Sequence, residues 1–227
     1  MKRKFYDGEG ALFKAAAEKP ESENLASRGL MYGSEAQEIE AVLRAFIRMI
    51  DLKGLYRQGW LKRGVPESRA ESVADHSFGT ALLALLLAES LAASSEFSGL
   101  DPRRCIEMAL VHELGEVYVG DITPVDGVSK DEKYERERDA FIKVVDGLPI
   151  RDRLLEFWED FEAGVSPEAR FIRQLDRLEM GVQAALLKAE GFERMEEFLE
   201  SARRSVTQPD LRAILALAEA KAAHKST

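Results

Sequence analysis

The most informative segment of the chain is residues 109–116, with the sequence Ala109-Leu-Val-His112-Glu113-Leu-Gly-Glu116. On a helix, residues three, four and seven positions apart lie along one stripe, so His112, Glu113 and Glu116 are predicted to converge. The chain has only three histidines, and this one lies in an apolar segment beside carboxylates. Burying such groups without partners costs several kcal/mol. We therefore expect a helix that directs these side chains to a metal ion or a hydrogen-bond network.

Two further segments carry the same residue types, Ala74-Asp-His76-Ser and Gln174-Leu-Asp176-Arg. Ser72 is suited to cap a helix that begins there, which places His76 near the first turn of that helix. Asp176 lies beside the apolar face of the helix expected over residues 167–190. Three helices that each present a ligand-type side chain near an apolar face predict a metal site inside a helical bundle.

Each of these residues taken alone also fits an ordinary role. The His-Glu-x-x-Glu string is compatible with a solvent-facing stripe, and it lacks the second histidine of the zincin motif. His76 fits a capping or core histidine. Asp176 fits a carboxylate in a salt bridge.

The periodicity of the chain is helical nearly throughout. Apolar residues from Ile39 to Ile50 follow the spacing of an amphipathic helix, and Asp101-Pro102 is a typical helix start. No stretch shows the alternation and β-branched enrichment of a strand. We predict an all-α fold with helices over residues 39–50, 72–93, 101–116, 131–147, 150–163, 167–190, 192–204 and 208–224. Residues 1–34 lack this period and are expected to form an N-terminal arm, and the charged run 130–139 a solvated helix face.

Composition restricts the class of protein. A length of 227 residues fits one domain, and the net charge of -9 argues against a nucleic-acid polymer as partner. No apolar run approaches the roughly 20 residues of a transmembrane helix, so we expect no membrane association. The single cysteine, Cys105, excludes an internal disulfide and favours the cytoplasm. Cys105 itself has the character of a small buried residue rather than a nucleophile.

Five motifs in order carry a family resemblance: Gly59-Trp60, Glu71-Ser-Val-Ala-Asp-His-Ser77, Met108-Ala-Leu-Val-His-Glu-Leu-Gly-Glu-Val117, Gly120-Asp-Ile-Thr-Pro124 and Gln174-Leu-Asp-Arg-Leu-Glu-Met180. Over residues 36–190 the chain resembles the HD-domain phosphohydrolases, and within them the 5′-deoxynucleotidases. The resemblance implies an HD-domain-like helical bundle, here residues 35–227, with a metal site between helices.

The resemblance also implies a ligand set for one divalent cation, which could be Mn, Co, Mg, Zn or Fe. Carried over by position, the ligands are His76, His112, Glu113 and Asp176. The family pattern has aspartate where this chain has Glu113. Glutamate keeps the charge and the oxygen donors but adds a methylene, so its carboxylate must bend or the helix must shift.

By the same resemblance, Glu116 corresponds to the family's acidic residue that assists proton transfer, and Asp121 to an aspartate near the substrate sugar. The implied reaction is attack of a cation-activated water on the phosphorus of a nucleoside 5′-monophosphate, giving nucleoside and phosphate.

The loop before His76 concentrates cations and an aromatic residue. Arg57 and Arg63 are candidates for holding the phosphate, and Trp60 for packing on the sugar or base. The ordinary alternative for each is a solvated arginine, or a tryptophan that anchors its loop to the core.

Three functions remain open at this point. The first is a 5′-deoxynucleotidase acting on deoxynucleoside monophosphates. The second is a metal- or nucleotide-binding regulatory protein in which Glu113 has reduced turnover. The third is an HD-type hydrolase of another nucleotide phosphoester. Leftover amphipathic surfaces in residues 131–163 and 192–224 would suit a homodimer or higher homo-oligomer.

Overall fold

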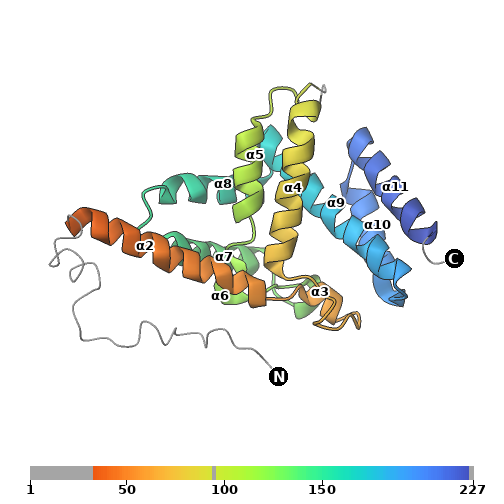
Figure 1. Cartoon of the computed structure of the whole chain (residues 1–227), viewed down its shortest axis with the longest axis horizontal. Helices are drawn as coiled ribbons and strands as arrows, with labels where there is room; N and C mark the ends of the chain where they lie inside the picture. Colours follow the sequence, from red (N-terminus) through yellow and green to blue (C-terminus); the bar gives the residue numbers. More distant parts are fainter. Residues whose placement is uncertain (1–32, 94–95, 225–227) are drawn as a thin grey trace. The chain divides into compact units, whose positions relative to one another are not determined.

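The computed structural model describes residues 33–93 and 96–224, so the predicted arm lies almost wholly outside the described residues. Helices are the only extended regular elements in this part of the chain (Figure 1), and an isolated bridge pairs Tyr56 with Ser72. The all-α prediction is confirmed. Over the same residues, no helix combines the length and hydropathy needed to cross a membrane.

The helices are α2 (Gly33–Ile50), α3 (Gln58–Leu61), α4 (Val73–Leu91), α5 (Pro102–Val111), α6 (Glu116–Val119), α7 (Lys130–Val145), α8 (Arg151–Ala163), α9 (Pro167–Ala189), α10 (Glu196–Ser205) and α11 (Pro209–His224), with short 3-10 turns η1 (Asp51–Gly54), η2 (Pro124–Asp126) and η3 (Glu193–Met195). They fall into two compact units. Unit 1 comprises the described residues of Met1–Leu55 together with Glu113–Leu155, and unit 2 comprises Tyr56–His112 and Glu156–Thr227. A single domain over 35–227 stays a prediction.

In unit 2, helix α9 is the central element. It packs against α4, α5, α10 and α11. A Cβ added at Gly181 of α9 would lie 2.7 Å from the Cβ of Ala202 and 2.8 Å from Cδ1 of Leu215, so α10 and α11 meet α9 at van der Waals contact there. The side chain of Gln174 on α9 accepts hydrogen bonds from the backbone N–H groups of Thr207 and Gln208, which fixes the connection between α10 and α11. Unit 2 thus holds its chemistry-bearing helices in a well-packed core.

In unit 1, helix α2 buries its small side chains. Ala36, Ala41 and Ala45 are buried, whereas the larger apolar residues of the predicted amphipathic pattern remain between 44% and 58% exposed, namely Ile39, Val42, Leu43 and Phe46. The periodicity therefore predicted the helix correctly. It did not predict which apolar side chains the fold would cover.

One helix prediction is wrong in its extent. The helix expected over residues 101–116 ends at Val111, residues 112–115 form a turn, and α6 begins at Glu116. At Gly115 in this turn, a Cβ would lie 2.7 Å from the carbonyl oxygen of Glu137 on α7. The close approach requires glycine, a poor helix former, at this position. His112, Glu113 and Glu116 therefore do not share one helical stripe.

The charged run 130–139 is only partly a solvated face. Intrahelical ion pairs form along it, including Lys133 with Glu137 and Arg136 with Glu132. Glu137, however, is buried, because α7 packs that side against α6. The prediction of a fully solvated face is wrong at Glu137.

Candidate metal centre

The start of α4 is set by a capping box. The Ser72 hydroxyl accepts a hydrogen bond from the backbone N–H of Asp75, and the Asp75 carboxylate accepts one from the backbone N–H of Ser72. Both contacts satisfy amide groups that have no partner inside the helix. The box fixes His76 as the fourth helical residue, in the first turn as predicted.

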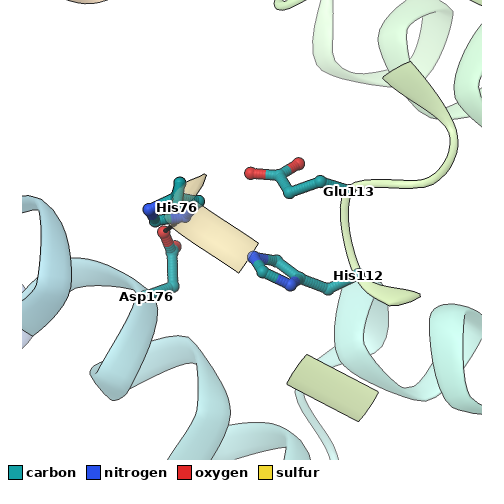
Figure 2. Close-up of side chains that lie close together, drawn as sticks. All are labelled: His76, His112, Glu113 and Asp176. Carbon is teal, nitrogen blue, oxygen red and sulfur yellow. Dashed lines mark ion pairs between the residues drawn. The ribbon is translucent and has the colours of Figure 1, made fainter. Parts of the chain in front are cut away.

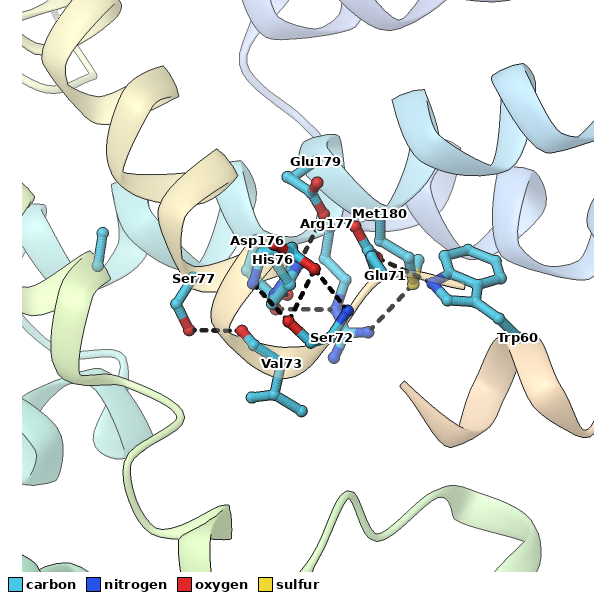
Figure 3. Close-up of polar contacts among 12 residues, drawn as sticks. Trp60, Glu71, Ser72, Val73, His76, Ser77, Asp176, Arg177, Glu179 and Met180 are labelled. Atoms are coloured by element: carbon cyan, nitrogen blue, oxygen red, sulfur yellow. Dashed lines mark hydrogen bonds and ion pairs between the residues drawn. The ribbon is translucent and has the colours of Figure 1, made fainter. Parts of the chain in front are cut away.

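His76 lies between two carboxylates of α9 (Figure 3). Its Nε2 is 3.1 Å from Oδ1 of Asp176, and its Nδ1 is 2.6 Å from Oε2 of Glu179. The ring is 0% exposed. Burial and the Arg57 charge oppose the imidazolium, but the hydrogen bonds to Asp176 and Glu179 outweigh them and raise the pKa of His76 to about 10.

Asp176 is correspondingly held in its ionised form. Burial opposes the charge, but the hydrogen bond to His76 and the charges of Arg177, His76 and His112 move the pKa of Asp176 well below its usual range. The Arg177 guanidinium lies 3.5 Å from Oδ2 of Asp176. Without a cation, this half of the site is a buried ion-pair cluster.

His112 is held in a different way. It caps the C-terminus of α5, and its Nδ1 lies 2.7 Å from the carbonyl oxygen of Ala109. Because a carbonyl only accepts, Nδ1 must carry a proton, and Nε2 holds the lone pair whenever the ring is neutral. The ring packs against Phe161, with centroids 4.8 Å apart, and lies 5.6 Å from the ring of His76.

The four predicted ligands lie together (Figure 2). One ligand atom each of His76, His112, Glu113 and Asp176 lies within 4.8 Å of the others. Two imidazole nitrogens and two carboxylate oxygens are the donor types that zinc, manganese, iron and cobalt sites use. The Glu113 carboxylate reaches the set despite its added methylene. These residues therefore fit a divalent cation.

Trp60 occupies the core. Its ring is 1% exposed and packs against Phe198 with centroids 4.4 Å apart. Its Nε1–H donates a hydrogen bond to Oε1 of Glu71 at 2.8 Å. This placement corresponds to the ordinary alternative, a loop anchor, and leaves almost no ring surface for a sugar or base.

Glu71 belongs to the second of the five sequence motifs and is a half-buried carboxylate. Burial and the neighbouring charge of Glu179 raise the pKa of Glu71 to about 7, against the opposing effects of His76, Trp60 and Arg57. A second group, Glu71, His76 and Glu179, also has ligand-type atoms within 4.8 Å of one another. Glu179 and Glu71 thus form a layer behind His76.

The two predicted arginines differ in their surroundings. Arg57 is half-buried, and its charge is near enough to His76 and Glu71 to oppose part of the rise in both of their pKa values. Arg63 instead pairs with Glu197 through two nitrogens and lies over the ring of Phe198. Arg57 is therefore next to the candidate metal centre, while Arg63 is committed to an ion pair.

The remaining predicted residues belong to unit 1. Glu116 is buried and Asp121 is half-buried after the turn at Gly120. Lys133, which belongs to the charged run 130–139, is near enough to Glu113 and Glu116 for their charges to act on it. Burial opposes its charge, but Glu137, Glu113 and Glu116 raise the pKa of Lys133.

Cys105 is buried in the core of unit 2. Burial, with smaller contributions from Glu168 and Asp101, raises the pKa of the Cys105 thiol to about 12. Such a thiol is poorly nucleophilic near neutral pH, in agreement with the sequence-based expectation.

Glu179 was not predicted as a functional residue from the sequence. The available signal was its spacing: Glu179 lies three residues after Asp176, which places both carboxylates on the same face of α9. What the spacing alone does not show is that His76 inserts between them.

Comparisons with known proteins agree with this geometry. A family model described as HD domain matches residues 49–216. The human protein named 5′-deoxynucleotidase HDDC2 is 35% identical over 186 residues, which cover 79% of this chain and 85% of that relative. The mouse protein of the same name is 36% identical over 178 residues, covering 75% of this chain and 83% of the relative.

A solved structure shares the fold. The crystal structure of a protein from Pyrococcus horikoshii OT3 is 29% identical, superposes with a TM-score of 0.64, and covers 81% of this chain and 99% of that one. The fold, the ligand set and the sequence relatives point to the same conclusion. This chain belongs to the HD domain family.

Proposed function

We propose that this protein is a divalent-metal-dependent phosphohydrolase that acts as a 5′-deoxynucleotidase, converting deoxynucleoside 5′-monophosphates to nucleoside and phosphate. The observation that carries the proposal is the set of two buried imidazoles and two carboxylates with ligand atoms within 4.8 Å of one another. The substrate class is suggested by the relatives, which are named 5′-deoxynucleotidase.

In this proposal His76, His112, Glu113 and Asp176 hold the cation. A bound divalent cation would lower the pKa of a coordinated water and neutralise charge on the phosphoryl oxygens. The mixed nitrogen and oxygen donors suit Mn, Co, Zn or Fe better than Mg, which prefers oxygen ligands alone.

The surrounding residues would supply binding and proton transfer. Arg57, half-buried beside His76, is the first candidate to hold the phosphate, and Arg63 could do so only by leaving Glu197. Glu116 would donate a proton to the leaving 5′-oxygen, a role suited to a buried carboxyl group. We assign Asp121 to the substrate sugar, and Trp60 to support of the site through its hydrogen bond to Glu71.

The proposal is tested by phosphate release. Protein stripped with a chelator is reloaded with Mn²⁺, Co²⁺, Zn²⁺, Fe²⁺ or Mg²⁺ and assayed against deoxy- and ribonucleoside 5′-monophosphates, with cyclic and triphosphate nucleotides for comparison. We expect release from deoxynucleoside monophosphates with at least one cation, and loss of release in His112→Ala. Activity only on another phosphoester, or nucleotide binding without turnover at any cation, would overturn it.

We also propose a homo-oligomer in a reducing compartment such as the cytoplasm. The exposed apolar residues of α2 support an association surface, because contiguous exposed apolar groups often mark protein contacts. The single buried cysteine supports a setting that needs no disulfide. Sedimentation equilibrium of the purified chain tests the first point, since a monomer at micromolar concentration would contradict it.

A further inference from the structure

The Glu179 carboxylate contacts the ring nitrogen of His76 that faces away from Asp176. Its Oε2 lies 2.6 Å from Nδ1, while Nε2 lies 3.1 Å from Asp176 (Figure 3). We propose that Glu179 is a positioning residue for metal binding, which accepts the Nδ1 proton of His76 and so presents Nε2 to the cation. The inference deepens the proposed function and rests on it, because it takes His76 as a ligand.

The chemistry follows from the donor and acceptor inventory. A neutral imidazole has one N–H and one lone pair, and an ionised carboxylate can only accept. With Glu179 at Nδ1, the proton stays on Nδ1 and the lone pair on Nε2. In the opposite tautomer, the Nδ1 lone pair would face the carboxylate. Carboxylates in this position fix the ring of a ligating histidine and raise its basicity.

Gly79 gives Glu179 the space to make this contact. A Cβ added at Gly79 would lie 2.9 Å from Oε1 and 3.0 Å from Cγ of Glu179. Gly79 is three residues after His76 on α4, so both lie on one face of that helix. Glycine inside a helix costs about 1 kcal/mol relative to alanine. Its presence within the 19-residue α4 is explained if clearance for Glu179 outweighs that cost.

Another role for Glu179 has to be distinguished. Glu71, His76 and Glu179 form a second group with ligand-type atoms within 4.8 Å of one another. In that arrangement Glu179 would bind a cation directly, and His76 would use Nδ1 as a ligand. In the positioning role the cation is bound by Nε2 of His76 and Nδ1 keeps its proton, whereas in the alternative Nδ1 is the ligand and carries no proton.

The test is a titration of the full-length, chelator-stripped chain with Co²⁺, followed by visible absorption. We expect binding about 10–100-fold weaker in Glu179→Ala than in the wild type. Glu179→Gln keeps an acceptor at Nδ1 and should stay within a few-fold of the wild type. Glu190→Ala, which removes a carboxylate paired with Arg69 at the end of α9, is the matched control and should bind normally.

Gly79→Ala is an independent test that leaves the Glu179 carboxylate in place. It should weaken Co²⁺ binding roughly tenfold while the thermal midpoint of the metal-free chain stays equal or rises, because alanine favours the helix. Gly54→Ala is its control, since a Cβ there meets nothing within 4 Å. A merely structural role for Gly79 would lower midpoint and affinity together.

Imidazole ¹⁵N spectra read the tautomer directly, and three histidines make assignment simple. In the zinc form, which is diamagnetic, His76 should carry its proton on Nδ1. Gly79→Ala should shift the ¹⁵N signal of Nδ1, and this test remains available if Glu179→Ala fails to fold. Unchanged affinity in Glu179→Ala, equal loss in Glu179→Gln, or an Nδ1 of His76 without a proton in the zinc form would overturn the inference. Tight cation binding without phosphate release would overturn the proposed function alone, and no binding at all would overturn both.

Discussion

The two histidines of the candidate centre are anchored in opposite ways. The Nδ1 of His76 is held by a side-chain carboxylate, and its Nε2 by a second one. The Nδ1 of His112 is held by the carbonyl of Ala109, three residues back in its own helix. One anchor depends on long-range packing between α4 and α9, and the other is built into the end of α5.

This difference means that the ion pairs of the site are concentrated at the His76 end. At the His76 end, a buried imidazolium with a pKa near 10 balances the charges of Asp176 and Glu179. A cation that takes Nε2 must displace a proton from this cluster, so metal binding and proton release are coupled there. At the His112 end, the backbone carbonyl of Ala109 sets the tautomer at Nδ1.

The largest expected contrast is between His76→Ala and His112→Ala. Both remove a proposed ligand, so both should weaken Co²⁺ binding more than 100-fold. Their effects on the metal-free chain should differ. His76→Ala leaves Asp176 and Glu179 without their buried counter-charge and should cost about 3–5 kcal/mol in the free energy of unfolding. His112→Ala removes the hydrogen bond to the Ala109 carbonyl and should cost about 1–3 kcal/mol.

Urea denaturation at neutral pH with excess chelator measures both losses. Equal destabilisation would break the comparison, because it would mean that the carboxylates beside His76 are not held by its charge. His224, near the C-terminus and outside both clusters, offers a matched control as His224→Ala.

The second prediction concerns the pH dependence of stability at the His76 end. The pKa of Glu71 is about 7 in the folded chain against an ordinary 4.5, so the folded state holds this proton more tightly than the unfolded state. Stability from this group is therefore complete below about pH 4.5 and is lost as the pH rises towards 7. Glu71→Gln should remove this loss and be more stable than the wild type by about 2–3 kcal/mol above pH 7.

Thermal or urea unfolding of both proteins from pH 5 to pH 8, with chelator, checks this. The two curves should converge at low pH and separate as the pH rises. Parallel curves would show that Glu71 does not titrate in this window.

The third prediction tests the His112 end through Glu113. Its carboxylate already reaches the ligand set, so Glu113→Asp withdraws the oxygens by about 1.5 Å, one carbon–carbon bond. We expect Co²⁺ affinity and phosphate release to fall by up to tenfold, with the fold unchanged. Glu113→Gln keeps the length of the side chain and removes its charge. Comparing it with Glu113→Asp separates the effect of side-chain length from the effect of charge. A rise in turnover in Glu113→Asp would instead favour a regulatory protein in which glutamate has reduced catalysis.

The sequence predicted the helices well because their caps and periods are local. Ser72, Asp101 and Ser166 begin helices in the structure as their side chains suggest. It failed beyond Val111, where α5 ends and residues 112–115 form a turn before α6 begins at Glu116. Within that turn Gly115 packs closely against Glu137 of α7, and a local pattern contains no information on such a contact.

The ligand set was predicted for a related reason. Residue type and motif order are visible in the sequence, so His76, His112, Glu113 and Asp176 could be named. Glu71 and Glu179 could not be named in this way, because their approach to His76 depends on the packing of α4 against α9. The burial of Trp60 against Phe198 was not visible in the sequence either, so its contact with the sugar or base stays a prediction.

The smallest expected effect is at Trp60, which connects the loop to the His76 end. Trp60→Phe keeps an aromatic ring against Phe198 but removes the hydrogen bond to Glu71. A lost hydrogen bond of this kind should cost about 1 kcal/mol in the free energy of unfolding. Because the ring is almost fully buried, the KM for a deoxynucleoside monophosphate should change less than twofold. A ring that packs on the sugar or base would respond in the opposite way, with a raised KM and little change in stability, so unfolding and steady-state kinetics on the same variant decide whether this loop supports the His76 end or contacts the substrate.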